Sequence, residues 1–130
     1  MSTSESGAKV TRSIQFVGGV RIAYGIVALF KPRIWPKVFG IPADNQDMRA
    51  FNAFLGSRDI AIGLHSLAAK DPVRQRDTIL INHACEVFDT VVNVQEMRLK
   101  RPFGTFTVAG LAFNAIMHAI WIRVHLLRRG

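Results

Sequence analysis

The chain has 130 residues, of which 49% are hydrophobic, and it carries a formal net charge of +8. This length allows one domain and excludes two independent hydrophobic cores. Cys85 is the only cysteine, which excludes an internal disulfide framework and a cysteine-rich metal site. A strongly basic chain is typical of proteins that meet a polyanion, so nucleic acid and an anionic lipid surface are the two classes of partner to distinguish.

Residues 1–13 form a small and polar stretch, "MSTSESGAKVTRS". It lacks the apolar core and the small-residue cleavage site of a secretory signal, and its composition predicts a disordered tail. Residues 14–127 are expected to form a single four-helix membrane domain.

Four mainly apolar segments follow the tail, and connectors that contain Lys or Arg separate them. The segments cover residues 14–30, 50–69, 78–97 and 103–125. All five prolines fall in the connectors, where a helix must end. At about 1.5 Å of rise per residue, each segment has a length close to the ~30 Å hydrocarbon core of a bilayer. The sequence therefore predicts an all-α fold, a bundle of four transmembrane helices.

The first connector contains "PRIWPKVFGIP", in which prolines and aromatic residues alternate with Lys and Arg. Trp35 and Phe39 are expected to lie at the level of the lipid headgroups while the basic side chains extend outward. We interpret this stretch as an interfacial segment between the first two helices, with a plain surface loop as the alternative.

A soluble four-helix bundle has similar lengths, so the distribution of polar residues has to decide. A soluble helix presents a broad polar face, whereas each of these segments has one narrow stripe of small and polar residues at three- and four-residue steps. The stripes are Gly18, Arg21, Gly25 and Ala28; Asn52, Gly56, Asp59, Gly63 and Ser66; Asn82, Glu86, Asp89, Asn93 and Glu96; and Thr107, Gly110, Asn114 and His118. Such stripes are expected to face the axis of a membrane bundle, because small residues allow close packing and polar ones avoid lipid there.

Arg21, Asp59, Glu86 and Asn114 each lie near the middle of their own segment. In a bundle they reach similar depth and are expected to meet. Arg58 lies about 100° around the helix from Asp59, so it is expected to reach the flank of the same cluster.

The charges of this cluster do not balance. Two arginines, Arg21 and Arg58, face three acids, Asp59, Glu86 and Asp89. Either a histidine is protonated or one carboxyl retains its proton, and a retained proton suits a general acid or base, a proton carrier or a hydrogen-bond donor. The candidate catalytic residues are thus the three acids, and the candidate binding residues are Arg21, Arg58, His83, Asn114 and His118.

Other kinds of site are disfavoured. His83 and Glu86 have the spacing of helical metal ligands, but no second motif matches them, so we expect no metal. The basic connectors lie at both ends of the helices rather than along one face, which favours lipid headgroups over nucleic acid. No cofactor fingerprint is present, and we expect no cofactor.

The stretches "VRIAYGIVALFKPRIWPKVFGIP" and "GSRDIAIGL" support a resemblance. With an Arg and a Gly in the first helix, residues 39–42 after it, and the Gly56-x-Arg58-Asp59 box, the chain resembles a family of small bacterial and fungal integral membrane proteins defined only as a domain of unknown function, of the 4267 type. The resemblance covers the first half of the chain well and the second half by hydropathy alone. It implies a four-helix membrane fold and no established activity.

Two functions are expected from this reading. In the first, the cluster binds a lipophilic small molecule and can transform it by acid-base chemistry such as isomerisation, cyclisation or epoxide opening. In the second, the cluster is structural, in a non-enzymatic accessory subunit or a small proton-conducting bundle. The expected location is the cell membrane, multi-pass, with both termini cytoplasmic. The expected partners are membrane lipids, a lipophilic molecule, and further copies of the chain or a larger membrane complex.

Overall fold

The computed structural model describes residues 3–38, 46–100 and 105–129, and this part of the chain is all helical. The helices are α1 (Thr3–Phe30), α2 (Ile34–Val38), α3 (Gln46–Ala68), α4 (Pro72–Lys100) and α5 (Thr105–Arg129). The predicted all-α class is confirmed, with four long helices and the short α2 in the first connector.

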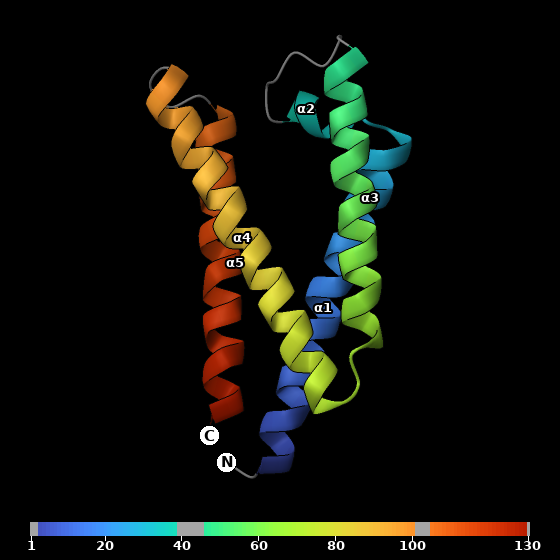
Figure 1. Cartoon of the computed structure of the whole chain (residues 1–130), viewed down its shortest axis with the longest axis vertical. Coiled ribbons are helices and arrows are strands. Elements are labelled where there is room, and N and C mark those ends of the chain that lie inside the picture. Colours follow the sequence, from blue (N-terminus) through green and yellow to red (C-terminus); the bar gives the residue numbers. More distant parts are fainter. Residues whose placement is uncertain (1–2, 39–45, 101–104, 130) are drawn as a thin grey trace.

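The long helices form two pairs, α1 with α3 and α4 with α5 (Figure 1). The pairs meet near the end of the molecule that holds both termini and the α3–α4 turn, and they diverge toward the opposite end, where α2 lies. Helix α4 crosses between the pairs and contacts α1, α3 and α5.

Glycines allow the backbones of α1 and α3 to touch. A Cβ atom added at Gly25 would lie 2.5 Å from the carbonyl oxygen of Gly56, and one added at Gly56 would lie 2.7 Å from that of Gly25. Gly63 has the same relation to Gly18, whose carbonyl oxygen would be 2.7 Å from an added Cβ. The first two predicted stripes therefore form the α1–α3 interface, as close packing of small residues requires.

A separate apolar cluster joins the helices near the termini. Its fully buried members include Ile14 in α1, Ile79 in α4 and Trp121 in α5. Val10 is buried against the same cluster. Helix α1 accordingly begins at Thr3, and residues 3–13, expected from their composition to be disordered, extend this helix instead. Packing of Val10 supplies the stabilisation that the polar composition does not indicate.

Helix α4 also begins earlier than its apolar segment, at Pro72. The Asp71 carboxylate caps it, because Oδ1 accepts hydrogen bonds from the backbone amides of Val73 (3.1 Å) and Arg74 (3.0 Å). The bond from the Arg74 amide lowers the pKa of Asp71 below its ordinary value. Proline suits the first position of a helix since it has no amide hydrogen to leave unpaired.

The connector after α1 folds back on the bundle. The ring of Trp35 stacks on Tyr24 with centroids 4.9 Å apart, and its Nε1 donates to the Tyr24 carbonyl oxygen at 3.2 Å. Asn52 donates from Nδ2 to the Pro32 carbonyl oxygen at 2.7 Å. Trp35 is thus half-buried against α1, while Phe39 lies outside the described residues.

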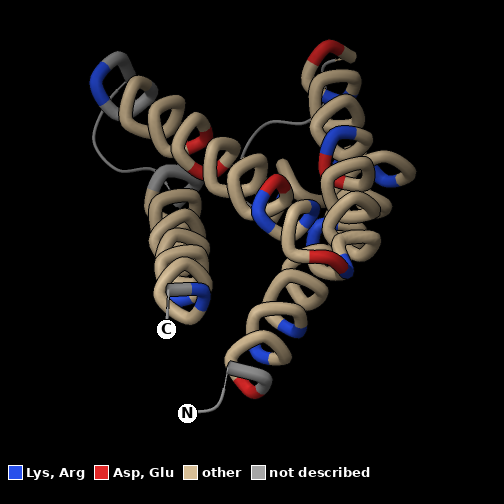
Figure 2. Tube along the Cα trace, turned by 60° about the horizontal axis from the view of Figure 1, so that its bottom comes forward, with Lys and Arg blue, Asp and Glu red and all other residues tan. Residues whose placement is uncertain are grey.

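Two described segments are long and apolar enough to cross a membrane, residues 5–30 within α1 and residues 108–128 within α5. Only 33% and 22% of their most apolar windows are buried. Core helices of soluble proteins are mostly buried, so this exposure favours a lipid environment. Figure 2 shows that charged residues on α5 are confined to its C-terminal end.

Candidate functional site

Arg21 is the centre of a buried polar group, the Arg21 cluster, which comprises Arg21, Asp59, Asn82 and Glu86. Its Nη1 donates to Asp59 Oδ1 at 2.5 Å, and its Nη2 donates to Glu86 Oε1 at 2.5 Å. Its Nε donates to Asn82 Oδ1 at 2.7 Å. Every nitrogen of the guanidinium thus has an acceptor, and one side chain of α1 joins α3 and α4.

The close approach of α1 and α3 positions this cluster. Arg21 lies between Gly18 and Gly25 on the contact face of α1, so its side chain leaves the helix directly beside Asp59. Asn82 is held in turn, since its Nδ2 donates to Ser66 Oγ at 3.1 Å and to the Thr78 carbonyl oxygen at 2.9 Å. These bonds fix the amide so that its oxygen faces Arg21.

A second ion pair, Arg58 with Asp89, lies beside the Arg21 cluster. Arg58 Nη1 and Nη2 donate to the two oxygens of Asp89 at 3.4 and 3.3 Å. Arg58 Nη2 also lies 3.6 Å from Asp59 Oδ1, which connects the two groups. Unlike Arg21, these side chains are accessible, with 32% of Arg58 and 37% of Asp89 exposed. The two Arg58–Asp89 hydrogen bonds, at 3.4 and 3.3 Å, are longer than the ~2.7–2.9 Å of a tight charged hydrogen bond.

The five charged residues pair largely as expected from the sequence, and the count remains two arginines to three acids. Glu86 is only 1% exposed, and its Oε2 atom has no hydrogen-bond partner within the described part of the chain. A buried polar atom without a partner carries a desolvation cost, which is smaller for a neutral carboxyl than for a carboxylate. Glu86 is therefore the acid whose surroundings fit a retained proton best.

The remaining candidates form a separate group between α4 and α5. Thr90 Oγ1 donates to the Glu86 carbonyl oxygen at 2.7 Å and lies 3.1 Å from His118 Nε2. Asn114 donates from Nδ2 to the same hydroxyl at 3.2 Å. Thr90 Oγ1 therefore connects Asn114 and His118 of α5 to the backbone of α4.

His83 also lies along the contact between α4 and α5, which we call the α4–α5 seam, and its ring is between two histidines of α5. Its ring centroid is 5.4 Å from that of His118 and 5.6 Å from that of His125. The three rings form a row rather than a single coordination shell. The described residues contain no group of three or more His, Cys, Asp or Glu side chains placed to hold a metal ion.

The sequence-based assignment thus divides in two. Arg21, Asp59 and Glu86 come together, with Arg58 and Asp89 on their flank, whereas His83, Asn114 and His118 belong to the α4–α5 seam. Two residues that were not proposed as site members take part in these groups. Asn82 hydrogen-bonds Arg21, and Thr90 hydrogen-bonds Asn114 and His118. Asn82 had a detectable signal, because it stands on the polar stripe one turn before Glu86. Thr90 had none, since a lone threonine is common in an apolar helix.

Comparison with known protein families, with curated proteins and with solved structures gives no match, so the resemblance suggested by residues 20–42 and 56–64 stays a prediction.

Proposed function

We propose that the chain is a multi-pass protein of the cell membrane in which all four long helices cross the bilayer, with both termini on the cytoplasmic side. The exposed apolar surfaces of α1 and α5 support this placement. A central Arg, Asp or Glu opposes insertion by roughly 2.5–3.5 kcal/mol, so α3 and α4 need their charges neutralised. The ion pairs with Arg21 and Arg58 neutralise two of the three acids, and a retained proton on the third completes the balance.

Within this membrane domain, the proposed function is binding of a lipophilic small molecule through its polar group. The observation that supports it is the Arg58–Asp89 pair, which is one-third exposed although it lies in the middle of α3 and α4. A charged pair left partly open at hydrocarbon depth is unfavourable unless another polar group covers it. A carbonyl, hydroxyl or epoxide oxygen on an otherwise apolar molecule has the required chemistry.

The Arg21 cluster would then be the rigid base of the binding site. Its hydrogen bonds hold Asp59 and Glu86 in place, and Arg58 and Asp89 face the bound molecule. Acid-base chemistry on the ligand, such as isomerisation, cyclisation or epoxide opening, would fall to Asp89, which is accessible, and to Glu86, which has a free oxygen. Asp59 is engaged by both arginines and is assigned a positioning role.

A second candidate function is that of a non-enzymatic accessory subunit, or a small proton-conducting bundle, in which all these charges are structural. The complete pairing of Arg21 favours it, because a saturated guanidinium needs no ligand. Under this proposal the Arg58–Asp89 pair is covered by a helix of a partner chain.

Native mass spectrometry of protein purified from its own membranes separates the two candidates. We expect a bound lipophilic molecule on the parent protein and its loss from the double variant Arg58→Leu/Asp89→Leu, which removes a positive and a negative charge together. The matched control is Glu5→Gln/Lys9→Gln, which removes an ion pair of the same signs at the exposed start of α1, where the side chains are 2.7 Å apart. Equal retention by both double variants contradicts the binding function, and co-purification of a partner chain that the first variant loses favours the accessory subunit.

A further inference from the structure

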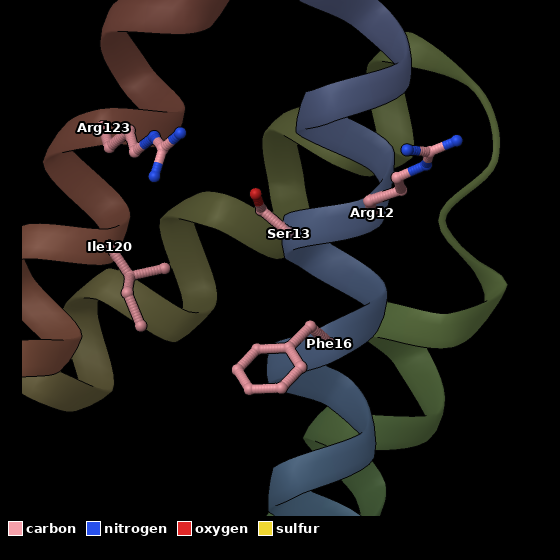
Figure 3. A pocket seen from close by; sticks show the side chains of 5 residues that line it. All are labelled: Arg12, Ser13, Phe16, Ile120 and Arg123. Carbon is pink, nitrogen blue, oxygen red and sulfur yellow. The ribbon is translucent and has the colours of Figure 1, made fainter.

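A cavity of about 300 Å³ lies between α1 and α5, away from the Arg21 cluster. Arg12, Ser13 and Phe16 line it from α1, and Ile120 and Arg123 line it from α5 (Figure 3). It is open on one side, so it is a groove on the surface of the bundle. We call it the α1–α5 groove.

Both walls of the groove change from charged to apolar in the same direction. Helices α1 and α5 run antiparallel, so Arg12 and Arg123 are nearer the termini, and Phe16 and Ile120 lie about one turn further into the bundle. Phe16 and Ile120 point toward each other across the groove. Phe16 is 66% exposed, which leaves most of its ring available to an apolar ligand.

The charged end of the groove offers two arginines that lack a carboxylate partner within the described residues, together with the Ser13 hydroxyl. The guanidinium of Arg123 extends toward Ser13, whereas the side chain of Arg12, which lines the groove near α1, extends its guanidinium away from both. Within the described residues, neither arginine has a carboxylate partner, whereas the neighbouring acids Glu5 and Asp71 pair with Lys9 and Arg74. Ser13 donates to the Lys9 carbonyl oxygen at 3.0 Å and can exchange this bond for one to a ligand oxygen.

We propose that the α1–α5 groove binds one anionic membrane lipid. The phosphate of its headgroup lies between Arg123 and Ser13, Arg12 adds positive charge from the far side of the α1 wall, and an acyl chain lies over Phe16 and Ile120. A charged headgroup at the helix ends and an apolar chain one turn deeper match the gradient along both walls. This site rests on the proposed insertion of α1 and α5 in the membrane, and it is independent of the proposed ligand at Arg58 and Asp89.

The test measures lipid binding to the full-length protein in detergent. The probes are phosphatidylglycerol and phosphatidylcholine with the same acyl chains, and glycerol phosphate as a headgroup without chains. We expect selective binding of phosphatidylglycerol, and a loss of about tenfold or more in affinity in Arg12→Gln/Arg123→Gln, because each basic residue near the headgroups contributes on the order of a fivefold factor.

The matched control is Lys31→Gln/Lys37→Gln, which removes the same charge from exposed residues at the other end of the bundle. It is expected to bind phosphatidylglycerol within about twofold of the parent protein, as expected for charges outside the binding site. An equal loss in both double variants, or equal binding of phosphatidylcholine, overturns the proposal. If glycerol phosphate binds as tightly as phosphatidylglycerol, the groove is a site for a free phosphate, and the proposal of a lipid site is overturned.

The apolar half is tested by Phe16→Ala. This variant is expected to weaken long-chain phosphatidylglycerol severalfold and to leave glycerol phosphate binding unchanged, since only the chain contacts Phe16. Carbonate extraction tests the proposed membrane location independently of lipid binding to the groove. A protein that resists extraction but does not select phosphatidylglycerol overturns the groove alone, whereas a protein extracted as soluble overturns both.

Discussion

The Arg21 cluster and the Arg58–Asp89 pair are neighbours with the same chemistry and opposite accessibility. Arg21 is buried and all three of its nitrogens are bonded, whereas Arg58 and Asp89 are one-third exposed and separated by longer distances. The difference arises from the helix faces that carry them. Arg21 and Asp59 stand on the glycine faces that bring α1 and α3 together, and Arg58 stands one residue off that face. In this chain, adjacent charges on one helix therefore divide between holding the bundle and facing outward.

The largest effect on stability is expected from Arg21→Met, which removes the central residue of the Arg21 cluster. Asp59 and Glu86 would then be buried without a cation, and loss of a buried partner typically costs about 3–5 kcal/mol of unfolding free energy. Thermal melting in detergent should fall sharply. Melting equal to that of the parent protein would show that the cluster does not hold α1, α3 and α4 together.

Gly56→Leu tests the helix contact that closes this cluster. A side chain at this position would meet the Gly25 carbonyl oxygen at 2.7 Å, and backbone cannot move aside as a flexible side chain can. Overpacking of this kind costs about 1–3 kcal/mol of unfolding free energy.

The control for this variant is Gly19→Leu, because a Cβ added at Gly19 meets no atom within 4 Å. Both substitutions place leucine in a long helix of the bundle. Equal melting temperatures for the two variants would contradict the close approach of α1 and α3.

A much smaller effect on stability is expected from Arg58→Leu/Asp89→Leu. Partly exposed ion pairs contribute roughly 0–1 kcal/mol, and removing both charges leaves neither one unpaired. Detergent melting should shift by a few degrees at most while ligand binding is lost. A destabilisation as large as that of Arg21→Met would place this pair in the structural core and remove the contrast between the two groups.

The smallest expected change is spectroscopic. Because two arginines face three acids, one carboxyl should give a protonated band in infrared difference spectra between pH 6 and 8, and its unpaired oxygen indicates Glu86. Glu86→Gln should remove the band and Asp89→Asn should leave it. If neither substitution removes a protonated band, Glu86 and Asp89 are both ionised and the acid-base function loses its support.

The polar stripes were predictable because small and polar residues recur at helical spacing against an apolar background. The buried residues of α3 are the predicted stripe, Asn52, Gly56, Asp59, Gly63 and Ser66. The pairing of Arg21 with Asp59 and Glu86 followed from equal depth and opposite charge. These predictions needed only the period of the helix and the cost of burying a charge.

Other features were not accessible from the sequence, because they depend on which helices become neighbours. Residues 3–13 have the composition of a tail, yet Val10 finds a partly apolar surface made by α4 and α5. Asn114 was expected at the depth of Arg21, but Asn114 and His118 face α4 across a different contact, where Thr90 is their partner. The spacing of polar residues along one helix identifies a face of that helix, but it does not specify which other helix packs against this face.

The order in which the chain is synthesised gives the Arg21 cluster a further consequence. Arg21 precedes Asp59 by 38 residues and Glu86 by 65 residues. At about 5–20 residues per second, roughly 3–13 s separate the synthesis of Arg21 from that of Glu86. Early in this interval Arg21 has neither carboxylate of its cluster, and until Glu86 follows it has only Asp59, so under the proposed membrane insertion α1 would first lie in an aqueous or protein-lined environment. If α1 is inserted as proposed, its release into lipid is thereby tied to the arrival of α3 and α4.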